Sequence, residues 1–362
     1  MANITFLIGN GFDLTCGLKS RYTDTYEGYI KRNSSSSIIE QFKMAINKDI
    51  QTWADFEMQL AEYATALKSE EDLVACIRDY EEYLSDYLLA EQKRFWDDYN
   101  RLLSTTLLHK EMRRSLVQFY DGLTLNDIQV INTVFKSEPL LHYNFITYNY
   151  TDIFENLINN AIQSGHLSAY DSYHFLNSGV IHIHGALGRD ITLGVDNEDQ
   201  LSHITYRISN RTKRVLIKPV FLQSYDKARI ENATQAILNS DIICIFGLSL
   251  GDSDLTWRKL LAQWLESGES HHLVYYKHRC MNKTYHPTAV TLKMDDEEDV
   301  KEDLFSLLFR EPLEKERKER IISQIHIPIG VKIFNIEHAM SEADKTERIK
   351  HEIERVVIPT DV

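Results

Sequence analysis

The chain has 362 residues, enough for two domains or one large domain with insertions, and its 43% hydrophobic and 26% charged residues are ordinary for a globular protein. A net charge of −14 argues against an extended nucleic-acid-binding surface and means that an anionic ligand must be held by local donors. The sequence has no apolar run of transmembrane length, no signal peptide and no C-x-x-C pair among its four cysteines, so we expect a cytoplasmic protein without a membrane segment, zinc ribbon or disulfide framework.

The first stretch of the chain predicts a nucleotide site. Residues 4–8 have the pattern of a short buried strand that runs into Gly9-Asn10-Gly11, and residues 12–15 that of a helix start. Glycines let the backbone approach a ligand closely, and N–H groups at a helix N-terminus bind anions. We therefore expect the backbone N–H groups from Gly9 to Gly11 to hold phosphates. Because Leu14 replaces the third glycine of a G-x-G-x-x-G fingerprint, a turn required only by geometry is the alternative.

The next part of the chain is helical in character. Apolar residues recur at three- and four-residue spacing from about residue 37 to residue 122, as in Ile38, Phe42 and Ile46. Helix packing explains these stripes better than a cofactor site does. We predict that residues 25–138 form a helical insertion after the first strand and helix.

Strand patterns return beyond the insertion and alternate with helical ones. Strands are predicted at residues 142–147, 180–184, 191–194, 242–246 and 273–276, and helices at 152–163, 225–239 and 253–266. This alternation, with glycine turns after strands, predicts an open, mostly parallel Rossmann-like α/β sheet. Its core would comprise residues 1–24 and 139–290.

The last part, residues 291–362, is predicted to be an α/β C-terminal extension. It contains an acidic run at 295–303, helical patterns at 304–308 and 342–356, and strand-like patterns at 325–327 and 333–334. A solvated face explains the charges. No function is assigned to this extension.

Four of the predicted strands end in polar or glycine-rich residues. These ends are Gly9-Asn10-Gly11, Thr147-Tyr148-Asn149, His184-Gly185 and Gly247-Leu248-Ser249. In an open parallel sheet the ligand lies outside the carboxyl ends of the strands. The convergence of the four ends on one edge predicts a ligand site there.

With these strand ends in hand, the sequence resembles the phage abortive-infection family AbiH. The resemblance runs in order from residue 4 to about residue 260, over LIGNGFDLTCGLKSRY, the stretch from Trp53 to Glu57, FITYNYTDIFE, IHIHGAL with LGVDNED, and IFGLSLGDSD. It implies a protein of anti-phage defence.

The same segments are similar, more distantly, to sirtuin-like NAD-binding domains. The matches are Gly9-Asn10-Gly11, Gly17-Leu18, Asn149-Tyr150-Thr151, His184-Gly185 and Gly247-Leu248-Ser249. The chain departs from that pattern at Asn10, Asp13 and Thr151, and it lacks the zinc-binding cysteines of deacetylating sirtuins, which argues against a peptide deacetylase. The resemblance implies instead the NAD-consuming defence branch, with NAD as substrate.

Hydrolysis of NAD makes modest chemical demands. Nicotinamide leaves as a neutral molecule from a cationic ring, so no general acid is needed, unlike an ordinary glycoside. His184 is our candidate base, and Asn149 can hold both a water and a ribose hydroxyl. The alternative for each is a structural role, since His and Asn at strand ends often only make hydrogen bonds or turns.

The remaining candidate residues are expected to bind the nucleotide, and no metal is expected. Asp13, Arg21 and Asp196 are the weakest candidates, because each can also be a surface or capping residue. The residues assigned to cofactor binding are Gly9, Asn10, Gly11, Phe12, Asp13, Arg21, Gly185, Gly247, Ser249 and Leu250.

The function that follows is an abortive-infection effector that hydrolyses NAD to nicotinamide and ADP-ribose. Because such an activity must be silent in healthy cells, we expect a homo-oligomer, a regulatory partner or a phage-derived trigger, acting through the insertion. One alternative is a module that senses a nucleotide without turnover. Another is a metal-dependent nuclease or nucleotide hydrolase, for which the nearest acidic groups are Asp252, Asp254 and residues 295–299.

Overall fold

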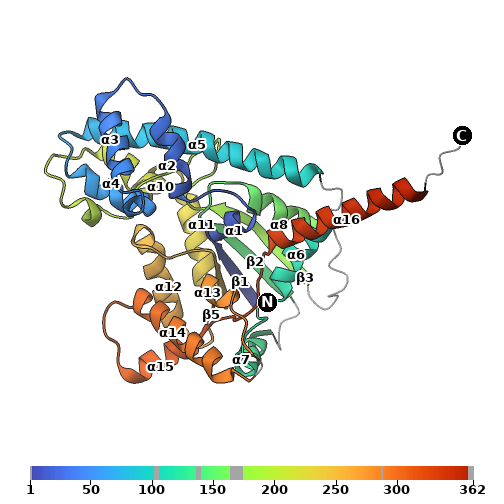
Figure 1. The fold of residues 1–362 in the computed structure, drawn as a ribbon. Coiled ribbons are helices and arrows are strands. Elements are labelled where there is room, and N and C mark those ends of the chain that lie inside the picture. The colour runs from blue at the N-terminus through green and yellow to red at the C-terminus, as the bar shows by residue number, and fades with distance from the viewer. Residues whose placement is uncertain (1, 102–105, 136–139, 164–173, 287, 358–362) are drawn as a thin grey trace, which may run out of the picture.

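The computed structural model describes residues 2–101, 106–135, 140–163, 174–286 and 288–357. In these residues a central sheet is covered by helices on both faces, and a group of helices stands at one end (Figure 1). None of the described helices combines the length and hydrophobicity needed to span a bilayer.

The sheet has six strands, and every neighbouring pair is parallel. In spatial order β3-β2-β1-β4-β5-β6, the chain leaves β1 in one direction and later continues from β4 in the other, as in a Rossmann fold. This confirms the predicted α/β fold class. The strands are β1 (Ala2–Ile8), β2 (Leu140–Thr147), β3 (His174–His182), β4 (Ile242–Phe246), β5 (His272–Tyr276) and β6 (Ile325–His326).

The central strands are apolar because both of their faces are covered. Phe6 of β1 packs into a hydrophobic cluster on one face, and its neighbour Leu7 packs into another on the opposite face. Continuous apolar runs are typical of such buried parallel strands. Ile8 pairs with Thr147 on one side and with Phe246 on the other, so three strands end level at the carboxyl edge.

The covering helices divide between the two faces (Figure 1). Helices α6, α7, α8 and α16 pack on the Phe6 face, and α11, α12 and α14 on the Leu7 face. The described helices are α1 (Gly11–Thr15), α2 (Tyr22–Lys31), α3 (Ser37–Lys48), α4 (Phe56–Ala64), α5 (Glu70–Arg101), α6 (Thr106–Val117), α7 (Leu125–Phe135), α8 (Ile153–Gln163), α9 (Asn210–Leu216), α10 (Lys218–Tyr225), α11 (Lys227–Leu238), α12 (Leu255–Ser267), α13 (His278–Met281), α14 (Val290–Leu308), α15 (Lys315–Ser323) and α16 (Ile336–Val357), with short 3-10 turns η1 (Thr52–Ala54), η3 (Glu198–Leu201) and η4 (Asp252–Asp254).

The helices at one end form a third, aromatic-rich cluster. Helices α2 to α4 and the first half of α5 supply most of it, and Tyr26 donates a hydrogen bond of 2.6 Å to the Trp53 carbonyl inside it. The second half of α5, together with α6 and α7, packs on the sheet instead. The predicted insertion is therefore helical but contributes to two packing clusters. Its predicted end, between residues 138 and 139, lies outside the described residues.

Two short apolar stretches were predicted as strands and are not. Residues 191–194 are a loop that leads to a single bridge between Val195 and Ile217. Residues 333–334 are also a loop, in which Phe334 adopts a left-handed backbone with φ of 50° and packs its ring into the sheet core. Burial of these apolar side chains from loops produced a strand-like pattern.

Two other boundaries differ from the predicted ones. β3 ends at His182 and not at His184, so His184 lies in the following turn. The acidic run at 295–303 lies inside α14, where it is amphipathic: Val300 is buried and most of the acidic residues are at least partly exposed.

Candidate functional site

At the carboxyl edge of β1 and β4, two glycine turns contact each other. The Gly9 N–H donates to the Phe246 carbonyl and the Gly11 N–H to the Gly247 carbonyl, each with 2.9 Å between nitrogen and oxygen. A Cβ atom on Gly11 would lie 2.4 Å from the Cα of Gly247. The contact between the two turns therefore requires glycine at position 11.

This contact corrects the expected role of the first glycine turn. The N–H groups of Gly9, Gly11 and Phe12 all donate to main-chain carbonyls, so they are not free to bind phosphate. Helix α1 has only five residues, and its dipole is correspondingly small. The Phe12 ring is buried edge-on to Phe154 and Phe334 and belongs to the core.

A cleft of about 860 Å³ lies beside the two turns. Its walls come from the carboxyl ends of β1, β2, β4 and β5, from the turn after β3, and from η1 and α4 of the insertion. The predicted site residues that line it are Asn10, Gly11, Asp13, Arg21, Asn149, His184, Gly247 and Ser249.

Several of the predicted residues have a structural role in the described chain. Asn10 exchanges two hydrogen bonds with Ser20, and Arg21, with 61% of its side chain exposed, pairs with Asp24 at 3.9 Å. Leu250 is buried in the core with φ of 55°. Gly185 has φ of 83°, and a Cβ there would lie 1.9 Å from the Asp190 carbonyl oxygen, so this position is a tight turn.

Asp13 is the centre of a buried hydrogen-bond network. Its Oδ1 accepts from Asn149 Nδ2 at 3.0 Å, and both of its oxygens accept from Thr151 Oγ1, at 3.0 and 2.9 Å. Burial raises the pKa of the Asp13 carboxyl to about 7, and the two donors only partly oppose this. The network fixes the Asn149 amide so that its buried Oδ1 has no hydrogen-bond partner among the described residues.

His184 is held from two sides. Its Nε2 lies 3.2 Å from Asp254 Oδ1, and its ring stands edge-on to Tyr148 with 5.2 Å between the ring centroids. With Nε2 facing Asp254, Nδ1 is the ring nitrogen on the other side of the imidazole. His182, two residues earlier, instead contacts the Asn149 carbonyl and Glu155, each at 3.2 Å.

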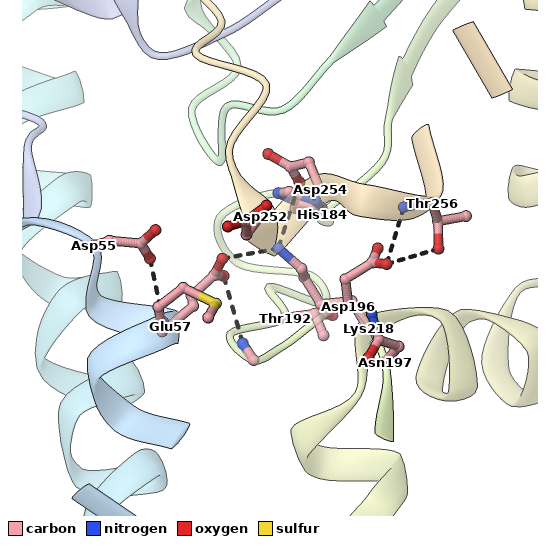
Figure 2. Close-up of polar contacts among 12 residues, drawn as sticks. Asp55, Glu57, His184, Thr192, Asp196, Asn197, Lys218, Asp252, Asp254 and Thr256 are labelled. Carbon is pink, nitrogen blue, oxygen red and sulfur yellow. Dashed lines mark hydrogen bonds and ion pairs between the residues drawn. The ribbon is translucent and has the colours of Figure 1, made fainter. Parts of the chain in front are cut away.

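Behind His184 lies a chain of buried charges (Figure 2). Lys218 Nζ lies 2.8 Å from Glu57 Oε2 and 3.5 Å from Asp254 Oδ1, the oxygen that also faces His184. Glu57 comes from α4 of the insertion, Lys218 begins α10, and Asp254 ends η4. The helical insertion therefore contributes a charged side chain to the site.

The charge partners set the ionisation of this network. Burial alone would raise the pKa of Asp254, but Lys218 and His184 lower it to about 2. Burial raises the pKa of Glu57 despite Lys218, and burial would lower the pKa of Lys218, but the two carboxylates raise it. A charged Asp254 therefore faces the His184 ring.

Two of these charged residues escaped the sequence interpretation. Glu57 lies in the stretch from Trp53 that carries the family resemblance, but no role was assigned to it. The only indication of a role in the sequence is an acidic residue among aromatic ones. Lys218, which pairs with a residue 161 positions away, gave none. Tyr148 was noted as part of a strand end and not assigned a role; its buried hydroxyl has no hydrogen-bond partner among the described residues.

The other acidic candidates have partners within the protein. Asp196 accepts two hydrogen bonds from Thr256, at 2.9 Å from its N–H and 2.8 Å from its Oγ1, and so caps the start of α12 (Figure 2). Asp252 pairs with Arg258 at 2.9 Å and with Arg310 at 2.5 Å. In the described residues, no three His, Cys, Asp or Glu side chains gather into a set able to hold a metal ion.

A comparison with family models identifies the chain. The model described as bacteriophage abortive infection AbiH matches residues 5–276, from β1 to the end of β5, and thus contains Asp13, Glu57, His184, Lys218 and Asp254. A search of curated proteins gives no match. Because the matched segment is most of the chain, the protein belongs to the bacteriophage abortive infection AbiH family.

Proposed function

We propose that the protein is an abortive-infection effector that binds NAD in the cleft and hydrolyses it to nicotinamide and ADP-ribose. The family supports a role in phage defence. The observation that carries the substrate and reaction is the pairing of two groups on one cleft: His184, held by Asp254, and Asn149, whose Oδ1 is unpartnered among the described residues.

The position and size of the cleft support a nucleotide ligand. It lies at the carboxyl edge between β1 and β4, where the strand order reverses and Rossmann folds bind dinucleotides. Its volume of about 860 Å³ falls in the range of roughly 300–1,000 Å³ typical of cofactor and small-molecule sites.

In the proposed reaction the bond between ribose C1′ and the nicotinamide nitrogen breaks, and its electron pair stays with the nitrogen. A water oxygen forms the new bond to C1′, and the water proton passes to Nδ1 of His184. The Asp254 carboxylate, opposite Nε2, orients the ring and stabilises the imidazolium that forms. Nicotinamide departs neutral, so the site needs no second acid.

Asn149 supports this reaction by position. Its Nδ2 is engaged by Asp13, so its Oδ1 is the free acceptor for a ribose hydroxyl or the attacking water. The oxocarbenium-like ribose is cationic, and Asp13, Glu57 and Asp254 line the cleft that would hold it. Acidic surroundings of this kind favour a developing positive charge.

The phosphates need donors other than the first glycine turn. Arg21, Lys277 and Lys332 also line the cleft. In a protein of net charge −14, these cations are the local donors that an anionic group would meet. We assign the diphosphate to this basic part of the cleft.

The experiment is nicotinamide release from NAD by the purified full chain, with and without chelator. We compare the wild type with His184→Ala, Asn149→Ala and the control His203→Ala, which changes an exposed histidine away from the cleft. Loss of a general base should lower turnover by at least about 100-fold, while the control stays at wild-type rate.

Binding measured by calorimetry separates the remaining outcomes. Wild-type protein that binds NAD without releasing nicotinamide would favour the sensing module. Loss of NAD without nicotinamide release, abolished by chelator, would favour the metal-dependent hydrolase, which breaks a phosphate bond. Wild-type protein that neither binds nor cleaves NAD would overturn the proposed function.

A further inference from the structure

The charges behind His184 come from three separate parts of the chain. We propose that Glu57 and Lys218 are positioning residues through which the helical insertion fixes Asp254 and, through Asp254, the protonation state of His184. The inference deepens the proposed function, because it names what holds the base; its test does not require NAD turnover.

The geometry places one cation between two carboxylates and next to the histidine. Lys218 Nζ lies 2.8 Å from Glu57 Oε2 and 3.5 Å from Asp254 Oδ1, and His184 Nε2 lies 3.2 Å from that same Oδ1. The side chains of Glu57, Lys218, Asp254 and His184 are all at most 10% exposed. Little water screens these contacts, so each charge acts strongly on the next.

The shared oxygen gives the pair its influence on His184. Protonated His184 and Lys218 are both attracted to the negative charge on Asp254 Oδ1. Because the two cations repel each other, the lysine opposes protonation of the histidine. Glu57 draws the lysine charge toward itself and thereby leaves more of the Asp254 charge for His184. Glu57 and Lys218 must therefore shift the titration of His184 in opposite directions.

The other groups around His184 cannot produce that pattern. The Tyr148 ring packs edge-on against the imidazole, and burial keeps the Tyr148 pKa well above its usual range, so it stays neutral. Asp196 interacts with Lys218 and Asp254, but its carboxylate accepts both hydrogen bonds from Thr256. Among the described residues, Glu57 and Lys218 are thus the charges whose removal should shift His184, and Glu57 also acts on His184 directly, in the same direction as through Asp254.

A purely structural ion pair is the competing explanation. Buried ion pairs often add little net stability over apolar residues of similar volume, so their presence does not by itself indicate what they do. The two explanations differ in what they predict for His184. A structural pair predicts lower stability when it is broken and no directed change in the histidine titration.

The test follows the ring signals of His184 by NMR as a function of pH, in the full chain. The His184 signal is identified by its loss in His184→Gln. The variants are Glu57→Gln, Lys218→Met and the double variant, and the matched control is Lys213→Met, which removes a cation 2.7 Å from Glu198 at the surface.

We expect Lys218→Met to move the His184 titration midpoint to higher pH, and Glu57→Gln to move it to lower pH. Each shift should be on the order of one pH unit, or tenfold in proton affinity, as for a charge change within about 4–6 Å. The double variant should return toward the wild-type midpoint, and Lys213→Met should not change it. If Lys218→Met does not fold, Glu57→Gln and the double variant still decide the matter.

Shifts in the same direction, or midpoints unchanged in all folded variants, would overturn the inference. Because the readout is the histidine itself, a protein with no NAD turnover can still show opposite shifts; in that case the proposed function fails and the positioning pair stands. Where turnover is present, the pH profile of kcat/KM should move with the midpoint in each variant.

Discussion

Two buried aspartates line the same cleft and are held in opposite ways. Asp13 is held by the neutral donors Asn149 and Thr151, and burial raises its pKa to about 7. Asp254 is almost as deeply buried but faces the cation Lys218, and its pKa is lowered to about 2. Hydrogen bonds from neutral groups do not offset the loss of solvent, whereas a nearby cation does.

The difference assigns distinct tasks to the two sides of the cleft. Near neutral pH Asp13 can carry or release a proton, so its network provides a fixed, weakly charged scaffold for Asn149. Asp254 remains a carboxylate, which suits a group that must orient a histidine. The following variants either remove this contrast or measure it.

The largest effect should come from Lys218→Met, which removes the lysine that lies between Glu57 and Asp254. Glu57 and Asp254 would be left as buried carboxylates with no cation between them. We expect the free energy of unfolding to fall by about 3–5 kcal/mol, measured by urea denaturation at pH 7. The surface control Lys213→Met should change it by less than about 1 kcal/mol. If Lys218→Met lowers the free energy of unfolding no more than Lys213→Met does, Lys218 does not stabilise the two buried carboxylates.

Asp13→Asn should remove a pH dependence that the wild type has. The folded-state pKa of about 7 is above the unfolded value of 3.8, so the stabilisation from the retained proton is fully present below about pH 4 and is lost as pH rises through 7. Between pH 4.5 and about pH 8, the free energy of unfolding of the variant should therefore rise by roughly 2–4 kcal/mol relative to that of the wild type. Urea denaturation at several pH values measures this, and a constant difference between the two proteins would refute a raised Asp13 pKa.

Asp254→Asn should show the opposite pH dependence. The folded-state pKa of about 2 lies below the unfolded value of 3.8, so the stabilisation is present above about pH 4 and is lost as pH falls through 2. The wild-type advantage over the variant should shrink by about 2.5 kcal/mol across that acid range. The same denaturation series, extended to low pH, checks it. An advantage that grows with acid would mean that Lys218 does not act on this carboxyl.

The fold could be predicted where the sequence signal is local. Strands β1, β4 and β5 are buried on both faces, so they appear as continuous apolar runs, and glycine turns mark the ends of β1 and β4. Phe334 could not be placed, because a loop residue that fills a core has the same apolar character as a strand residue. Sequence alone does not distinguish the two.

The site could be predicted only where strand ends supply it. Asn149 and His184 follow neighbouring strands, and the structure brings both to one cleft. The pairing of Glu57 with Lys218 joins positions 161 residues apart, and no periodicity reports such a contact. The N–H groups of Gly9 and Gly11 donate hydrogen bonds to carbonyls at the end of β4 and in the turn after it. This too is a tertiary contact, which a local motif cannot show.

The smallest effect should come from the basic part of the cleft, which neither aspartate network contains. Lys277 lines the cleft at the end of β5 and is partly exposed, so its charge is screened by water. If it contacts a phosphate of NAD, Lys277→Ala should raise the Kd by about 3- to 10-fold and leave the stability of the protein unchanged. Calorimetric titration with NAD at two salt concentrations measures this, because a phosphate contact weakens as salt rises.

The control Lys315→Ala removes an 88% exposed lysine of α15 and should leave the Kd unchanged. Equal affinity of the wild type and Lys277→Ala would move the diphosphate away from β5 and toward Arg21, which lines the cleft at the start of α2.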